Sequence, residues 1–361
     1  MPSSEPWVRD PLPAPGDLMG KSILVLGGGH IGSVVAEDIS IDTNHTVTVA
    51  DKNINDRLKD STVKTLACDL KPEIIHRLVD QVDVVVNALP SRMALLVWEA
   101  AVKHKVPLVD VSYQELYKHW EDWNEWALAQ KIPIIIDTGV APGLTNLVAG
   151  YVHHANGGIE AGRLYVGGMA ADPNAPYGYA TTWSLEDLYE EYVRKAALID
   201  RGTIIHRDAL SGVEEVYIPG VGMMEAFLTD GLRSALRLKN VKTLFEKTMR
   251  HPGHVEKVLP LLKDKEKFIG ELHKCREVED QLVLFCDIDG RQFRMVEKGQ
   301  DGLTAMQRTT ALTTSVVTKL VAGDRIKPGL MGMEHLAKDF YQIIVDELAT
   351  YSVILEEITA P

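Results

Sequence analysis

Short apolar, β-branched stretches alternate with amphipathic stretches of helical period over the first part of the chain. This alternation is typical of a parallel sheet with helices on both faces, because strands buried on both sides read as short apolar runs. The pattern predicts strands at Ser22–Gly27, Thr46–Asp51, Thr65–Asp69, Val82–Leu89, Val106–Val111 and Ile132–Asp137, with the clearest helices at Ser91–Lys105 and Glu115–Lys131. We therefore expect an α/β domain with a doubly wound parallel sheet over residues 20–146.

The pattern changes after residue 146. Further strands are predicted at Arg163–Gly167, Thr203–His206, Glu214–Ile218, Gln281–Ile288 and Arg291–Glu297, the last two flanking the hairpin-turn signal Asp289-Gly290. Ser184, with Asp187 three residues later, begins a predicted helix that reaches Ala197. Another long helix is predicted from Leu303 to Ala322, ending at Gly323. We expect a second α+β domain with an antiparallel sheet over residues 147–302 and, because of its five prolines, an extended arm over residues 1–19.

The turn after the first predicted strand has the pattern Gly27-x-Gly29-x-x-Gly32, with His30 and Ile31 between the last two glycines. The first glycine permits a tight turn, the second lets the backbone approach a pyrophosphate, and the third lets the helix pack closely on the strand. The amino end of that helix then faces the anion. The motif, set between a strand and a helix, predicts a Rossmann-type dinucleotide site formed by these five residues.

Asp51 ends the second predicted strand, where a carboxylate can accept hydrogen bonds from the adenosine ribose. A 2′-phosphate a few ångströms from this carboxylate would be repelled by about 1–4 kcal/mol, depending on the local dielectric. This repulsion favours NAD over NADP as the cofactor. Lys52, Asn53 and Arg57 follow closely and offer groups that would weaken the preference.

The other predicted strands end at the same edge of the sheet, and ligands of such sheets bind beyond that edge. Asp69 follows the third strand, and we predict that it borders the cofactor. The same is predicted for the residues that follow the fourth strand, which are Asn87, Ala88, Leu89 and Pro90. This stretch also reads as the start of a helix with Ser91 as a capping or first-turn residue, and the two interpretations are compatible.

The fifth strand ends in Asp110-Val-Ser112-Tyr113, which offers a carboxylate, a hydroxyl and a phenol at the ligand edge. We predict that Asp110 accepts the proton released in the reaction, directly or through water, with Tyr113 as the second candidate. Ser112 is predicted to contact the substrate. The competing interpretation is that Asp110 only caps the following helix.

Further candidates for the substrate lie at and after the predicted domain boundary. The planar guanidinium of Arg233 can clamp a carboxylate, and Asp230 or Glu225 can meet an ammonium group. Asn146 ends the glycine-containing stretch 139–146, which is predicted to join the two domains beside the substrate. An Asp-Gly turn followed by a solvated arginine explains the spacing around Arg233 equally well. The scattered histidines show no paired-ligand spacing, so we predict no metal.

The composition restricts the class of protein. The 361 residues, 45% of them hydrophobic, suffice for two cores, and the net charge of −13 disfavours a nucleic acid or an anionic membrane as partner. Cys68, Cys275 and Cys286 are widely spaced and form no CxxC pattern, so we expect no disulfide framework or zinc site and a reducing cytoplasm. There is no apolar run of membrane-spanning length and no signal-peptide core near the amino terminus.

Segments along the whole chain resemble the saccharopine dehydrogenase-like family, and within it most of all the lysine 6-dehydrogenases. The matching segments are Val109–Ser112, Gly139–Asn146, Tyr165–Gly168, Thr182–Ser184, Asp187–Arg194, Glu225–Ser234, His251–His254 and Gln307–Thr310. The resemblance implies a Rossmann domain, a substrate and oligomerisation domain that forms a homodimer, and a segment 303–361 that returns to the first domain. It also implies NAD-dependent oxidation of the lysine ε-amine to the 6-semialdehyde, which cyclises to piperideine carboxylate, with release of ammonia and NADH.

Two other functions stay open at this point. A saccharopine dehydrogenase, or another carbon–nitrogen dehydrogenase acting on an amino acid or polyamine, belongs to the same family. Saccharopine has an additional dicarboxylate arm that calls for more cationic groups, and the available ones are Arg163, Arg194, Arg201, Arg291 and Arg294. The non-enzymatic alternative is an NAD-binding regulator that has lost its chemistry.

Overall fold

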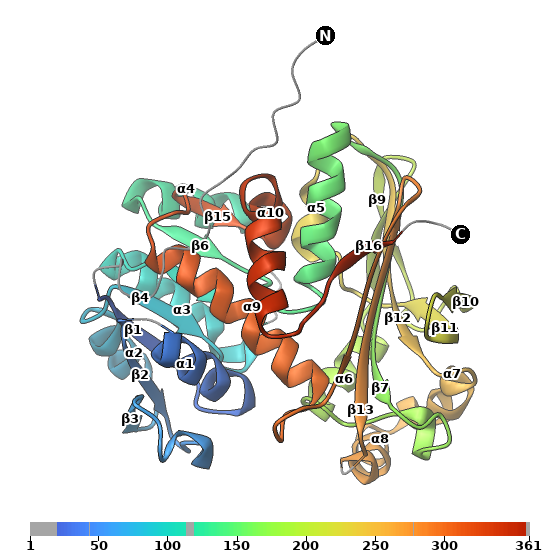
Figure 1. Ribbon diagram of the computed structural model, residues 1–361, viewed down its shortest axis with the longest axis horizontal. Coiled ribbons are helices and arrows are strands. Elements are labelled where there is room, and N and C mark those ends of the chain that lie inside the picture. The colour runs from blue at the N-terminus through green and yellow to red at the C-terminus, as the bar shows by residue number, and fades with distance from the viewer. Residues whose placement is uncertain (1–19, 43, 113–118, 277, 359–361) are drawn as a thin grey trace.

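The computed structural model describes residues 20–42, 44–112, 119–276 and 278–358. Two β-sheets lie beside each other, and the long helices α9 and α10 lie between them (Figure 1). The first sheet belongs to the amino-terminal part of the chain and the second to the central part. The predicted residue Tyr113 and the proline-rich arm 1–19 lie outside the described residues.

The first sheet is parallel throughout and has the strand order β15-β6-β5-β4-β1-β2-β3. Its strands are β1 (Ser22–Leu26), β2 (Thr46–Asp51), β3 (Lys64–Ala67), β4 (Val84–Asn87), β5 (Leu108–Asp110), β6 (Pro133–Ile135) and β15 (Gly329–Met331). The apolar side chains of its central strands are buried, as continuous apolar runs require. The predicted doubly wound parallel sheet is therefore confirmed.

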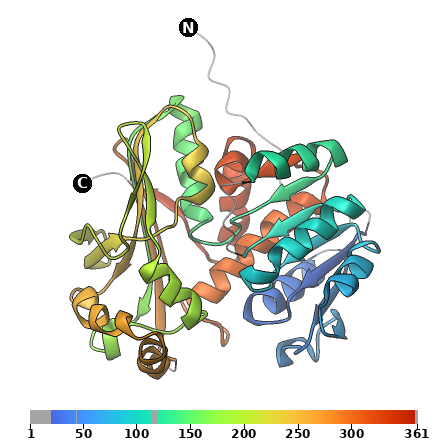
Figure 2. The ribbon, with the colours of Figure 1, turned by 180° about the vertical axis from the view of Figure 1, so that it is seen from behind.

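Helices cover both faces of this sheet. They are α1 (His30–Asp42), η1 (Asp56–Leu58), α2 (Pro72–Val79), α3 (Ser91–His104), α4 (Trp120–Gln130) and, from the carboxyl-terminal part, α9 (Ala305–Ala322). α1 and α9 pack together on one face, and α2, α3 and α4 cover the other (Figure 2). Helix α9 ends at Gly323, as its sequence predicts.

The second sheet has the order β10-β11-β12-β7-β13-β14-β16, with β8 pairing with β12 and β9 pairing with β8. Its strands are β7 (Ile159–Ala170), β8 (Ala196–Asp200), β9 (Thr203–Arg207), β10 (Glu214–Ile218), β11 (Gly222–Leu228), β12 (Val241–Arg250), β13 (Asp280–Ile288), β14 (Arg291–Lys298) and β16 (Glu356–Ile358). The sheet is mixed, because β7 and β12 run parallel. The expectation of an antiparallel sheet is corrected at this pair, whose connection is long enough for a parallel crossover.

The helical segments of the central part are α5 (Leu144–Asn156), η2 (Pro176–Gly178), α6 (Leu185–Val193), η3 (Arg233–Arg237), α7 (His254–Val258), η4 (Leu259–Lys263), α8 (Lys265–Leu272) and η5 (His273–Cys275). Ser184 caps α6 by accepting a hydrogen bond from the Asp187 amide at 3.3 Å, as predicted. The helix ends at Val193 instead of Ala197, because residues 196–200 join the sheet as β8.

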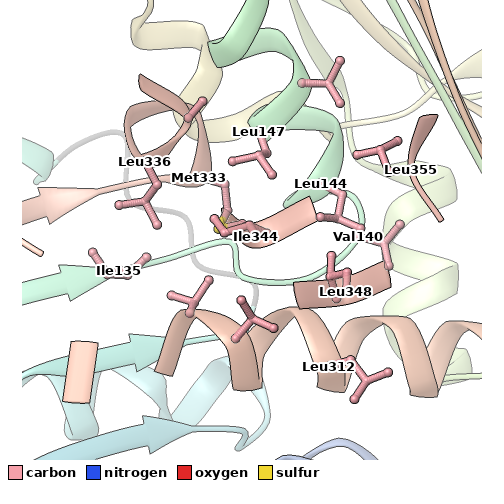
Figure 3. Close-up of a cluster of buried hydrophobic side chains, with 14 of the residues drawn as sticks. Ile135, Val140, Leu144, Leu147, Leu312, Met333, Leu336, Ile344, Leu348 and Leu355 are labelled. Atoms are coloured by element: carbon pink, nitrogen blue, oxygen red, sulfur yellow. The ribbon is translucent and has the colours of Figure 1, made fainter. Parts of the chain in front are cut away.

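Apolar side chains fill the space between the two sheets. Leu144 and Leu147 of α5, Leu312 of α9, and four residues of α10 (Met333–Thr350) converge there, namely Met333, Leu336, Ile344 and Leu348 (Figure 3). The same buried cluster reaches strands of both sheets, such as β1 and β13. Residues 303–361 are divided between the sheets, since β15 joins the first and β16 the second. The shared core sets where side chains of the second domain lie relative to the strand ends of the first.

Candidate coenzyme and substrate site

The glycine turn has the geometry that a dinucleotide requires. Gly27 has a positive φ of 108°, and a Cβ there would lie 2.5 Å from the carbonyl oxygen of Ala88. A Cβ on Gly32 would lie 1.9 Å from the carbonyl oxygen of Gly27, so side chains are excluded at both positions. A Cβ on Gly29, by contrast, would meet no described atom within 4 Å. The turn is closed by packing on two sides and open where a pyrophosphate would approach.

Asp51 is held beside this turn by two backbone amides. Its carboxylate accepts a hydrogen bond from Gly28 at 2.7 Å and another from Asn53 at 2.9 Å. Arg57, which would weaken the preference for NAD, is ion-paired with Glu37. A phosphate at Asp51 would therefore meet a fixed negative charge, and the nearby arginine already has a carboxylate partner.

The stretch after β4 lies against the glycine turn and also begins α3. Asn87 is buried; its side-chain oxygen accepts a hydrogen bond from the Leu89 amide at 3.2 Å, and its amide group donates to the Ser112 hydroxyl at 3.2 Å. Pro90 precedes the first helical residue, Ser91. The interpretation as a helix start is confirmed, with Ser91 in the first turn of α3, and contact of residues 87–90 with a cofactor stays a prediction. Asn87 connects the loop that borders the turn with the loop after β5.

Asp69 follows the end of β3 and is exposed, as are Gly29 and His30. Ile31 is half-buried in the first turn of α1. These residues stand at the carboxyl edge of the sheet, where they were predicted, and their contact with a cofactor stays a prediction.

Asp110 is completely buried at the end of β5, where hydrogen-bond donors of Ser112, Trp98 and Asn87 surround its carboxylate. One oxygen, Oδ1, accepts from the backbone amide and the hydroxyl of Ser112, at 2.7 and 2.6 Å. The other, Oδ2, accepts from the indole nitrogen of Trp98 at 2.5 Å. Burial raises the pKa of Asp110, while these hydrogen bonds act against that rise. Ser112 is only half-buried, and its hydroxyl is bonded to the buried carboxylate of Asp110. Among the described groups, it can therefore connect the ligand edge with Asp110.

Arg233 reaches the carboxyl edge of the first sheet and forms an ion pair there. Its Nε lies 2.9 Å from Oδ1 of Asp137, which follows β6, and the two side chains are only 2% and 0% exposed. The Ser234 hydroxyl lies 3.1 Å from Asp137 and 2.8 Å from Glu334 of α10. A substrate carboxylate would have to share this buried guanidinium with Asp137, whose charge would repel it. The predicted carboxylate clamp stays a prediction.

The remaining predicted substrate residues also have partners within the protein. Asp230 is buried and lies 3.3 Å from the guanidinium of Arg194. Glu225 accepts hydrogen bonds from two backbone amides at the start of α7, at 3.0 and 2.7 Å. Asn146 is buried and donates to the carbonyl oxygen of Leu232 at 2.9 Å. These contacts hold the turn around Arg233 and the second sheet in place, and substrate contact by these residues has no direct support.

Contacts at β7 bring together three segments that are far apart in the sequence. A Cβ on Gly168 would lie 3.2 Å from the methyl carbon of Met306 and 3.8 Å from the hydroxyl of Thr182. Gly168 and Thr182 belong to two of the segments that carry the family resemblance, and Met306 directly precedes a third, Gln307–Thr310. Gly139, at the end of the first domain, lies beside Thr310 of α9. A Cβ on Gly139 would lie 3.5 Å from the methyl carbon of Thr310.

Sequence reasoning missed three polar residues that shape this region: Trp98, Asp137 and Glu334. Asp137 ends a predicted strand and was within reach of the strand-end rule. Trp98 and Glu334 lie within helices, and nothing in their local sequence indicates which strand end they approach.

Other kinds of site find no support in the described ranges. There, no group of three or more His, Cys, Asp or Glu side chains is arranged to bind a metal ion. Among the helices that the structure describes, none has the length and apolar character needed to cross a membrane.

Known proteins are similar to this chain in both domains. The family model of the saccharopine dehydrogenase NADP-binding domain matches residues 23–136, and that of the saccharopine dehydrogenase C-terminal domain matches residues 139–271. The saccharopine dehydrogenase (NADP(+), L-glutamate-forming) of Saccharomyces cerevisiae is 24% identical over 260 residues, covering 68% of this chain and 58% of the yeast protein. The mitochondrial alpha-aminoadipic semialdehyde synthase of Mus musculus is 23% identical over 258 residues, covering 65% of this chain and 27% of the mouse protein.

The fold is shared over a longer stretch than these alignments cover. The solved structure of apo saccharopine dehydrogenase (L-Glu forming) from Saccharomyces cerevisiae has a TM-score of 0.75 and 18% identity, covering 95% of this chain and 100% of that chain. The chain thus spans about half the length of the curated yeast relative and about a quarter of the mouse one. Since saccharopine dehydrogenase family models match both of its domains, the chain belongs to the saccharopine dehydrogenase-like family.

Proposed function

We propose that the chain is an NAD-dependent oxidoreductase that oxidatively deaminates the ε-amine of L-lysine. The observation that supports this most is the hydrogen-bonded series Asn87–Ser112–Asp110, which connects the loop at the glycine turn with a buried proton acceptor. A dinucleotide site beside such an acceptor suits the oxidation of an amine, which must lose a proton as well as two electrons.

The residues that would hold the cofactor are those of the glycine turn, Asp51 and the loop after β4. NAD held by these residues would supply the hydride acceptor for the carbon that carries the amine. The protein's own part in the reaction is the transfer of a proton. Ser112 takes a proton from the substrate ammonium and gives its own to Oδ1 of Asp110, which lies 2.6 Å away. Burial raises the pKa of Asp110, which makes its carboxylate a stronger base than an exposed aspartate.

The products follow from the chemistry of the substrate. The oxidised substrate is an imine, which water hydrolyses to ammonia and the 6-semialdehyde. The semialdehyde then closes on its own α-amine to give piperideine carboxylate. Tyr113, the second candidate for the proton acceptor, lies outside the described residues.

The environment of Asp51 supports NAD as the cofactor. The carboxylate is fixed by two amides, and Arg57 is engaged by Glu37. A 2′-phosphate would therefore be repelled at this position. The matching family model and the yeast relative carry NADP in their names, so NADP is the alternative that must be tested beside NAD.

The arginines of the second domain support lysine over saccharopine. Arg194 is ion-paired with Asp230, and Arg291 and Arg294 are ion-paired with the carboxylates of β16. Arg163 and Arg201 are exposed on β7 and in the turn between β8 and β9. The additional carboxylates of saccharopine would need cations of this kind, and three of the five have a carboxylate partner already. The names of the relatives favour saccharopine, which is therefore the alternative substrate.

We also propose that the chain forms a homodimer through its second domain. Tyr217 and Met223 lie opposite each other on the β10–β11 hairpin and are 63% and 45% exposed. Apolar side chains of this size on a hairpin are suited to burial between subunits. Sedimentation velocity would detect the dimer, and a monomer at micromolar concentration would contradict the proposal.

The experiment that tests the activity combines two substrates with two cofactors. The absorbance of the reduced cofactor is followed with L-lysine or saccharopine, each with NAD or NADP, without added glutamate or 2-oxoglutarate. We expect NADH and an equal amount of ammonia from lysine and NAD. Turnover of saccharopine with release of glutamate would establish the alternative substrate. Binding of NAD without turnover of either amino acid would support the regulator.

A further inference from the structure

Trp98 reaches the proposed proton acceptor from the face of the first sheet that α3 covers. It belongs to α3, it is completely buried, and its indole nitrogen donates to Oδ2 of Asp110 at 2.5 Å. Ser112 approaches the other oxygen, Oδ1, with its amide and its hydroxyl. The two carboxylate oxygens therefore have different partners, one on the buried side and one on the ligand side.

The partners differ in what they can accept. An indole nitrogen and a backbone amide only donate hydrogen bonds, whereas a serine hydroxyl can both donate and accept. A proton on Oδ2 would point at the donor of Trp98 and lose that hydrogen bond. A proton on Oδ1 can be given to the Ser112 hydroxyl, or taken from it, without disturbing Trp98. The arrangement allows protonation on the side of the serine and opposes it on the side of the tryptophan.

Every group that contacts Asp110 in the described chain is neutral. These groups are Trp98 from α3, Ser112 from the loop after β5 and Asn87 from β4, whose side-chain amide acts on the carboxylate and is also bonded to the serine hydroxyl. The amide and hydroxyl of Thr138 donate to the backbone carbonyl of Asp110 and not to its carboxylate. Among the described residues, no charged side chain is hydrogen-bonded or ion-paired with this carboxylate. The neutral donors alone therefore decide which oxygen takes the proton.

The orientation of the indole is set by a row of aromatic rings. Trp123 of α4 packs edge-on against Trp98 with the ring centres 5.2 Å apart, and Trp126 packs against Trp123 at 4.9 Å. Trp98 is buried, whereas Trp126 is 47% exposed. Helix α4 thus holds Trp98 in place from outside the sheet. Trp126 provides a matched control, because it belongs to the same row and is far from the carboxylate.

We propose that Trp98 is a positioning residue for the reaction: its N–H bond keeps the proton off Oδ2 of Asp110 and so directs proton transfer through Ser112. This inference rests on the function proposed above. Trp98 acts through Asp110 and does not itself touch the substrate. Its loss should raise the pKa of Asp110, because the N–H bond stabilises the charged carboxylate.

The first test replaces Trp98 by phenylalanine, which keeps an aromatic ring and removes the donor. The acid limb of the pH profile of kcat/KM for lysine should move to higher pH by about one to two units, each of which corresponds to about 1.36 kcal/mol. Trp126→Phe should leave the limb where it is in the wild type. An unmoved limb in Trp98→Phe, or an equal shift in both variants, would overturn the proposal, because Trp126→Phe alters the same row of rings and keeps the N–H bond to Asp110.

A second measurement uses the wild-type chain and needs neither turnover nor a folded Trp98 variant. In protein labelled with ¹⁵N-tryptophan, one indole resonance should move with pH as Asp110 titrates, and Asp110→Asn should abolish that movement. No titrating indole in the wild type would overturn the inference. A titrating indole in a protein that oxidises neither lysine nor saccharopine would uphold the hydrogen bond and reject the proposed function, so the two failures are distinguishable.

Discussion

Two buried aspartates follow neighbouring strands of the first sheet and have opposite surroundings. Asp110 ends β5, Asp137 follows β6, and both are almost completely buried. Burial raises the pKa of each. The donors around Asp110 are neutral, whereas Asp137 meets the guanidinium of Arg233, whose charge opposes the rise.

The difference separates a group that can exchange a proton from one that holds domains together. An acid whose donors are neutral, one of them a hydroxyl, can gain a proton without leaving a buried cation unpaired. An acid paired with a buried guanidinium cannot do so without a large penalty. Asp137, Arg233 and Glu334 come from three different parts of the chain, so their contacts connect the sheet, η3 and α10. A strand-end aspartate alone is therefore no sign of catalysis.

Removal of the guanidinium at the domain junction should have the largest effect. Arg233→Ala leaves the carboxylates of Asp137 and Glu334 buried without it, and breaking a buried pair costs about 3–5 kcal/mol. Urea unfolding should show this loss of stability. The control is Arg237→Ala, whose ion pair with Glu121 is exposed and is worth about 1 kcal/mol or less. If Arg233→Ala is as stable as the wild type and has a greatly raised KM for lysine, Arg233 binds the substrate carboxylate and the structural role is contradicted.

Substitution of Asp110 at the end of β5 should lower the turnover rate and leave stability and NAD binding nearly unchanged. Asp110→Asn keeps the shape of the side chain but cannot accept the proton, and loss of a general base lowers turnover by about 100-fold or more. The affinity for NAD, measured by fluorescence titration, should change little because the glycine turn is untouched. Unchanged turnover would remove Asp110 from the mechanism. The two aspartates would then no longer differ in function.

A third buried acid sharpens the comparison through pH. Burial raises the pKa of Glu246 to about 8, and the group that hydrogen-bonds to it is the hydroxyl of Thr145, at 3.0 Å. Because the folded pKa lies above the unfolded one, its contribution to stability is present at low pH and is lost as the pH rises towards 8. Between pH 6 and pH 8, the free energy of unfolding of the wild type should fall by about 2 kcal/mol more than that of Glu246→Gln. Urea unfolding of both at the two pH values checks this, and parallel curves would refute it.

The smallest effect is expected at Asp51, on the choice of cofactor. Asp51→Asn removes the charge and keeps an acceptor for the Gly28 amide, which donates to the carboxylate at 2.7 Å. The preference for NAD over NADP, taken as the ratio of kcat/KM values, should fall about tenfold, equivalent to about 1.4 kcal/mol of repulsion. Wild type that prefers NADP from the start would show that Asp51 does not set the choice.

Signals that depend on residues close in sequence predicted local geometry correctly. The glycine motif forms the tight turn, the Ser184 hydroxyl caps its helix, and Asp289-Gly290 forms the hairpin turn. Partners that are distant in sequence were out of reach. Nothing near Arg233 indicates that it pairs with Asp137, which lies 96 residues earlier. Likewise, Trp98 reads as one apolar position among several on α3, and only packing of that helix on β5 reveals its hydrogen bond.

The most direct test of the account follows the hydrogen on the ε-carbon of lysine. L-lysine deuterated at carbon 6 is incubated with the protein and NAD, and the mass of the NADH and the amount of ammonia are determined. The account predicts NADH that is one mass unit heavier, with one ammonia for each NADH. Unlabelled NADH, or no NADH from lysine while saccharopine is oxidised, would contradict it.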